Sequence, residues 1–159
     1  MTQYKLNVQA TSNTSINTED TFVELKAATG VTIKVKRIRV GFSDGTATAG
    51  VDNHFRVKIA RWDTSTAGSS ASGTMNPVNA NANAATSTAK VKNGTTALAL
   101  GTTNVTVLDL VSINGRALYE WLARDDDDMY VTKTAGFLGI VIQSAVASQL
   151  FTVTADFVE

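Results

Sequence analysis

The feature that most constrains this chain is the alternation of apolar and polar residues with a period of two. Residues 55–60 and 151–157 both follow it, the latter as Phe151-Thr-Val-Thr-Ala-Asp-Phe157. Successive side chains of a strand point to opposite faces of a sheet, so each such segment buries one face. Shorter strands are expected at residues 4–9, 21–27, 97–100, 104–112, 129–133 and 137–143. The pattern therefore predicts an all-β protein.

Within residues 31–42 the alternation changes phase. Ile33 and Val35 share one parity, whereas Ile38 and Val40 share the other. This change predicts a β-bulge near Lys36-Arg37, or a strand that bends from one sheet into the next.

Turn dipeptides separate the expected strands: Thr29-Gly30, Asp44-Gly45 and Asn93-Gly94. We expect a loop at residues 144–148 to join the last two strands as a hairpin, and residues 117–123 fit a two-turn helix or a strand. Many short strands in a chain of 159 residues favour one domain, 1–159. Its predicted fold is a jelly roll or a related antiparallel β-sandwich with long polar loops.

Two polar segments interrupt this pattern, residues 10–20 and residues 63–90. The second consists mostly of Ala, Ser, Thr, Gly and Asn and holds the only proline, Pro77. A loop of that length in a compact domain is usually functional or disordered. Both segments are candidate contact arms that lie along a neighbouring subunit, and free surface excursions are the alternative.

Residues typical of catalysis are scarce. The chain has no cysteine and a single histidine, His54, and it contains no Gly-x-Ser-x-Gly, P-loop or dinucleotide motif. We therefore expect a protein that is not an enzyme and binds no cofactor. The longest apolar run, residues 137–142, is too short to cross a bilayer, so no membrane association is expected.

Fourteen basic residues balance fourteen acidic ones, which argues against a protein that binds nucleic acid directly. Basic residues nevertheless concentrate on two strands that we expect to be neighbours, where they would form a positive stripe. The candidate contact residues of this stripe are Lys34, Lys36, Arg37, Arg39, Arg56 and Lys58. Ion pairs across an interface with another subunit, or plain solubility, explain the stripe better than nucleic-acid binding, which interleaves charges with stacking aromatic residues.

Four consecutive carboxylates, Asp125, Asp126, Asp127 and Asp128, form the one acidic tract. Calcium takes several oxygen ligands, so these residues are weak candidates for a metal site. They lack the alternating Asp-x-Asp-x-Asp-Gly spacing, however, and a solvated turn is the simpler interpretation. Asp125 and Asp126 are also candidates for contacts with basic groups of another subunit.

The C-terminal part reads Gly115-Arg-Ala-Leu-Tyr-Glu-Trp-Leu-Ala123, then the acidic tract, then Leu138-Gly-Ile-Val-Ile142 and an alternating strand that ends in Glu159. It resembles the C-terminal part of small virion proteins of tailed phages and prophages. The resemblance implies a jelly-roll capsid decoration (cement) protein made in the host cytoplasm. Such a protein binds the outer surface of the major capsid protein lattice and stabilises it, as a homo-oligomer that is most often a trimer.

A carbohydrate- or receptor-binding module of a phage fibre or tail tip is the alternative. Its ring platform would come from Tyr4, Trp62, Tyr119, Trp121 and Tyr130. Exposed rings near a cation site would favour the alternative, whereas rings buried in the core would favour the cement protein.

Overall fold

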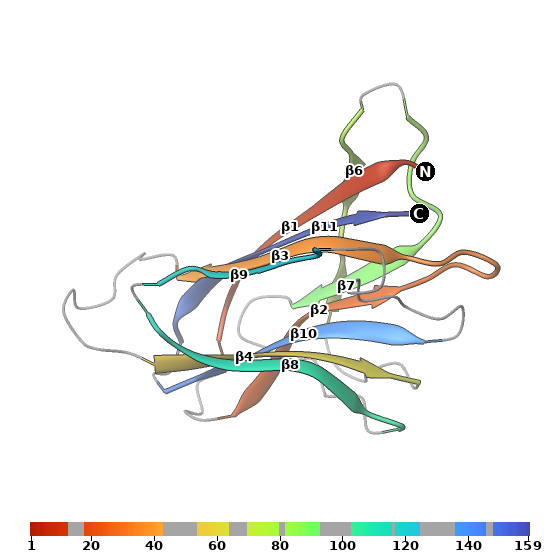
Figure 1. Ribbon diagram of the computed structural model, residues 1–159. Coiled ribbons are helices and arrows are strands. Elements are labelled where there is room, and N and C mark those ends of the chain that lie inside the picture. The colour runs from red at the N-terminus through yellow and green to blue at the C-terminus, as the bar shows by residue number, and fades with distance from the viewer. Residues whose placement is uncertain are drawn as a thin grey trace.

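The computed structural model is a sandwich of two antiparallel sheets (Figure 1). It describes residues 1–12, 18–42, 54–63, 70–79, 82–92, 103–115, 117–124, 136–145 and 148–159, with only the backbone of 70–72. Sheet A contains β1 (Gln3–Thr11), β3 (Lys34–Phe42), β6 (Met75–Pro77), β9 (Tyr119–Leu122) and β11 (Leu150–Val158). Sheet B contains β2 (Glu19–Lys26), β4 (His54–Trp62), β5 (Ser70–Ser72), β7 (Thr88–Lys92), β8 (Thr106–Asn114) and β10 (Phe137–Ser144). The predicted all-β class is confirmed.

The strand order is that of a jelly roll. Sheet A runs β6-β1-β11-β3-β9 and sheet B runs β5-β7-β2-β10-β4-β8. The first four strands, β1 to β4, pair antiparallel and in reverse order with β11, β10, β9 and β8. The chain is therefore one long hairpin wound across two sheets, with β5, β6 and β7 added along one side.

The hairpin predicted at residues 144–148 is wrong. β10 lies in sheet B between β2 and β4, whereas β11 lies in sheet A between β1 and β3. The chain crosses from one sheet to the other between these strands. Alternation reports which face of a strand is buried, but it does not report which strand lies beside it.

Four phenylalanine rings meet between the sheets, among mostly aliphatic core side chains. Phe151 of β11 makes edge-to-face contacts with Phe22, Phe42 and Phe55, at centroid distances of 5.7, 5.8 and 5.2 Å. These four rings come from both sheets, so they join the two layers. Each buried ring of this size contributes roughly 1.5–3 kcal/mol relative to an exposed one.

The change of phase in β3 is a β-bulge, as predicted. Asp156 of β11 lies opposite Arg37 and the next residue, Phe157, lies opposite Val35, so Lys36 is the extra residue of the bulge. The bulge lets Val35 and Ile38 both reach the core despite their different parity. Within the 117–123 segment, Tyr119–Leu122 form a strand, β9. The turn at Thr29-Gly30 is present, with Gly30 at φ 76° and the Val31 amide donating to the Ala28 carbonyl at 3.0 Å.

Part of the segment 63–90 belongs to the sandwich. β5 pairs with β7 in sheet B and β6 pairs with β1 in sheet A, so residues 70–77 cross between the sheets. Gly73 lies at this crossing, and its amide donates to the Ala89 carbonyl at 2.9 Å. A Cβ atom on Gly73 would collide with Val91 and crowd Leu6, so the crossing lies tightly against the core. This part of the predicted arm is therefore not a free excursion.

Strands β1 and β2 also occupy both ends of the other predicted arm, residues 10–20. The strands expected at 97–100 and 129–133, and the turns at Asp44-Gly45 and Asn93-Gly94, lie outside the described residues.

Candidate functional site

The predicted positive stripe is divided between the two sheets. Lys34, Lys36, Arg37 and Arg39 lie on β3 in sheet A, with β11 and β9 as neighbours. Arg56 and Lys58 lie on β4 in sheet B, with β10 and β8 as neighbours. The expectation that these strands are neighbours is therefore wrong. Both strands alternate in the same way, and strand pairing depends on long-range topology that alternation does not encode.

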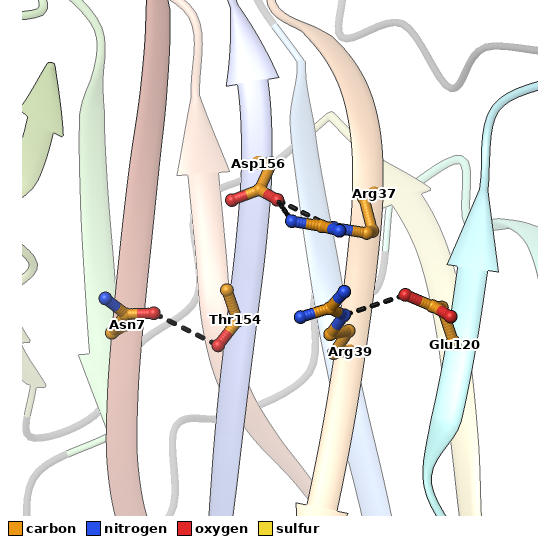
Figure 2. A network of polar contacts seen from close by, with 6 residues as sticks. All are labelled: Asn7, Arg37, Arg39, Glu120, Thr154 and Asp156. Carbon is orange, nitrogen blue, oxygen red and sulfur yellow. Dashed lines mark hydrogen bonds and ion pairs between the residues drawn. The ribbon is translucent and has the colours of Figure 1, made fainter. Parts of the chain in front are cut away.

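Two arginines of β3 form ion pairs within sheet A (Figure 2). Arg37 donates from Nε to Asp156 Oδ2 at 2.8 Å, and Asp156 is almost fully buried. Arg39 donates from Nε to Glu120 Oε1 at 2.7 Å on the exposed surface. These guanidinium groups therefore point along the outer face of the sheet toward β11 and β9, and their charges are already balanced within the chain.

The basic residues of β4 differ from each other. Lys58 pairs with Glu19 of β2, across the intervening strand β10. Arg56 and His54 are exposed on the same strand. Arg56 is thus the residue of this group that is most accessible to a partner.

A second set of charges is buried in sheet B. Lys92 Nζ lies 3.0 Å from Asp20 Oδ2, and these side chains are 0% and 1% exposed. The same ammonium group lies 5.5 Å from the centre of the Phe22 ring. Glu24 is also buried, and its Oε2 accepts a hydrogen bond from Trp62 Nε1 at 2.9 Å. A buried charge is strongly unfavourable without such partners, so these residues are part of the structural framework.

Large apolar side chains are exposed where β8 and β9 form the edges of the two sheets. Of the eight such side chains among the described residues, six lie between residues 105 and 122 and are 37–60% exposed. They are Val105, Val107, Leu110, Val111, Leu118 and Leu122, and we call them the edge patch. Contiguous exposed apolar patches of more than a few hundred Å² mark interaction sites, whereas single exposed apolar residues are normal on soluble proteins.

The side chains of the edge patch are divided between the outer faces of the two sheets. Leu110 lies opposite Lys58 and Val107 opposite Ala60 on β4 of sheet B. Leu122 lies opposite Arg37 on β3 of sheet A, and Leu118 approaches Gly41 of the same strand. A hydrogen bond from Tyr119 Oη to Asp109 Oδ2, at 2.6 Å, joins the two edges.

The backbone of β8 is partly closed to strand addition. A register shift makes Leu108 the extra residue of a bulge, because Asp109 lies opposite Ile59 and Val107 opposite Ala60. The Leu110 amide donates to Asp109 Oδ1 at 2.9 Å. Bulges and inward-pointing charges are the means by which proteins prevent edge-to-edge pairing. The edge patch therefore offers side chains more than backbone groups to a partner.

Most of the described aromatic residues that were candidates for a sugar platform are buried. Tyr4, Trp62 and Tyr119 are 3%, 1% and 5% exposed, and Trp121 packs against the core. The indole of Trp62 covers Gly139, where a Cβ atom would overlap the ring. These rings therefore do not offer the open face on which a sugar stacks. Tyr130 lies outside the described residues.

Polar side chains line cavities at two places among the described residues. One of about 310 Å³ lies at the end of β4, with Arg61, Asp63, Asn104 and Thr106 as polar walls. In it, Asn104 Nδ2 donates to Asp63 Oδ2 at 2.8 Å. The other, of about 320 Å³, lies beside β1 and is lined by Asn7, Gln9, Asn76 and Lys92 among others.

The acidic tract Asp125–Asp128 lies outside the described residues, so the candidate metal and contact residues there remain predictions. The part of the chain that the structure describes contains no cluster of three or more His, Cys, Asp or Glu residues able to hold a metal ion. It also contains no helix long and apolar enough to cross a membrane.

Sequence reasoning did not find the edge patch. A strand was expected at 104–112, but no exposed apolar side chains were expected on it. The signal was that Val107-Leu108 and Leu110-Val111 are adjacent apolar pairs, which place large side chains on both faces of one strand. Such pairs suit a strand covered on both faces, yet β8 is an edge strand exposed along most of its length.

Comparisons with known proteins do not assign the chain to a family: no protein-family model matches it, and neither a curated protein nor a solved structure does.

Proposed function

We propose that this chain is a structural protein of a phage virion, a decoration protein that binds the outer surface of the major capsid protein lattice. One observation carries the proposal: the strands follow jelly-roll order, the fold implied by the resemblance of residues 115–159 to small phage virion proteins. Three of the eight jelly-roll strands, β9, β10 and β11, come from that stretch.

The surface features are consistent with a protein that works by contact. The described tyrosines and tryptophans are largely enclosed, whereas Arg56 and the edge patch remain accessible. We propose that Arg56, Lys34 and Lys36, with Asp125 and Asp126 of the acidic tract, contact the capsid. We further propose that the protein acts as a homotrimer. It would be made in the host cytoplasm before it joins the virion.

The test is binding to shells assembled from the major capsid protein encoded in the same genome as this chain. We expect the purified chain to sediment with these shells and to raise the temperature at which they break open. Shells of an unrelated phage are the matched control, and they should not bind the chain. A chain that ignores its own shells would contradict the proposal.

A second candidate function, carbohydrate binding, is favoured by one observation, the cavity at the end of β4. Its carboxylate, amide, hydroxyl and guanidinium groups could bind sugar hydroxyls. A glycan array probed with the wild-type chain and with Asp63→Ala would test it. Binding that the Asp63→Ala variant loses would support this function, and absence of binding would contradict it.

A further inference from the structure

The ion pair between Lys92 of β7 and Asp20 of β2 lies entirely inside the sandwich. Its side chains are 0% and 1% exposed, and the two strands are neighbours in sheet B. Asp20 lies opposite Ile142 of β10, a core residue, so its carboxylate faces the space between the sheets. In each of the three ion pairs of β3 and β4 described above, by contrast, at least one side chain is 29% or more exposed.

The ammonium group of Lys92 is poorly satisfied in this position. It lies 5.5 Å from the centre of the Phe22 ring, which is itself fully buried. An ammonium group carries three donors, yet no acceptor among the described residues has hydrogen-bonding geometry toward Lys92 Nζ. Each ion therefore bears a large cost of desolvation that the other repays only in part. A reaction that removes both charges together would remove this cost.

We propose that Lys92 and Asp20 condense to an amide, a covalent cross-link between β7 and β2. Lys92 Nζ lies 3.0 Å from Asp20 Oδ2. The Cγ atom is bonded to that oxygen, so a small rotation of the side chain brings the nitrogen to the distance of about 3–3.5 Å at which groups react. The bond needs no metal, oxidant or other molecule.

The condensation balances within the pair. One proton passes from the ammonium to the carboxylate, which leaves a neutral amine and a carboxylic acid, the forms that an apolar interior favours. The nitrogen lone pair then attacks Cγ, the bond from Cγ to the hydroxyl oxygen breaks, and that oxygen leaves as water with a second proton from the nitrogen. The amide carries no charge, and the burial of both side chains keeps water from hydrolysing it.

The cross-link would close the chain between β2 and β7 into a covalent ring. A ring of this kind restricts the unfolded chain as a disulfide does, in a chain that has no cysteine. The proposal does not depend on a role in a capsid. The ion pair and the amide both couple residues 20 and 92 in stability, so chemical measurements are needed to distinguish them.

The intact mass of the protein, purified in its folded state and then denatured, tests the proposal. We expect the wild-type chain to be lighter than its sequence mass of 16.8 kDa by one molecule of water. Lys92→Arg keeps the positive charge but lacks an amine that can be deprotonated, so it should keep its full sequence mass. The matched control is Lys90→Arg. Lys90 lies 3.9 Å from Glu24 but is 42% exposed, so this variant should lose the water as the wild type does.

Digestion with trypsin locates the bond. Trypsin does not cleave after an acylated lysine, so the wild-type digest should contain residues 6–26 joined to residues 91–116. The Lys92→Arg digest should contain residues 6–26 alone. A wild-type chain of full sequence mass, loss of water from Lys92→Arg, or a lost water that maps to another peptide, such as the one that holds Asp44-Gly45, would each overturn the proposal.

Discussion

Tyr119 of β9 donates a hydrogen bond from Oη to Oδ2 of Asp109 on β8, at 2.6 Å, and so joins the edge strands of the two sheets. Asp109 lies opposite Ile59 of the core, and its second oxygen accepts the Leu110 amide. The carboxylate thus stabilises this side of the sandwich and orients the strand that carries the edge patch.

Removing this hydroxyl tests its contribution. Tyr119→Phe keeps the buried ring but leaves Asp109 with one fewer donor, so we expect the free energy of unfolding to fall by about 1–2 kcal/mol. Urea denaturation would measure the change. Thr154→Val is the matched control, since the hydrogen bond from Thr154 to Asn7 is exposed (Figure 2). The control should cost about 0.5 kcal/mol or less, and equal losses would show that the Tyr119 contact has no special role.

Gly139 of β10 is required by the indole ring of Trp62. A Cβ atom at that position would overlap the ring, which is itself fixed by its hydrogen bond to Glu24. Gly139→Ala should therefore destabilise the protein by roughly 1–3 kcal/mol, as other overpacked sites do. In Gly41→Ala, the new Cβ would lie 3.4 Å from Leu118, an ordinary contact, so a much smaller change in melting temperature is expected. A similar loss of stability in both variants would show that replacing any strand glycine destabilises the protein, and that the ring of Trp62 is not the cause.

The buried pair of Lys92 and Asp20 should show strong coupling. Lys92→Met leaves the Asp20 carboxylate in the interior without its cation, which costs about 3–5 kcal/mol. Replacing both residues, as in D20L/K92M, should cost less than the sum of the two single changes, because no uncompensated charge remains. A double-mutant cycle by chemical denaturation measures this difference. Simple additivity would contradict a close buried pair.

Glu159 makes the stability of the C-terminal end depend on pH. Partial burial acts to raise the pKa of this carboxyl, but hydrogen bonds from Ser87 and Thr86 outweigh burial and hold the pKa below its ordinary value of 4.5. Because the folded pKa is depressed, the contribution to stability is complete above the unfolded pKa and is lost as the pH falls through the folded pKa.

Glu159→Gln is the test of that dependence. The variant should be about 1 kcal/mol less stable than the wild type at neutral pH, since charged hydrogen bonds are stronger than neutral ones. The difference should vanish in acid, once the wild-type carboxyl is protonated. Thermal unfolding followed across the acid range measures it. A difference that stays constant with pH would contradict the role of the charge.

Local patterns determined much of the fold. The alternation in residues 55–60 and 151–157 predicted β4 and β11, and the change of phase in residues 31–42 predicted the bulge at Lys36. These features depend only on the two-residue period of a strand and on the burial of one face. The jelly roll was expected from the number of strands and turns together with the resemblance of the C-terminal part.

Tertiary structure alone decided which strands are neighbours. It placed β10 and β11 in different sheets, separated Arg37 and Arg39 from Arg56 and Lys58, and brought residues 70–77 across one side of the sandwich. It also left Leu110 and Leu122 uncovered at the other side. Apolar residues on a central strand and on an edge strand have the same sequence signature, because burial depends on what the rest of the chain packs against them. The sequence by itself therefore determined where the strands lie, while the order of strands in the sheets decided which of their side chains face a partner.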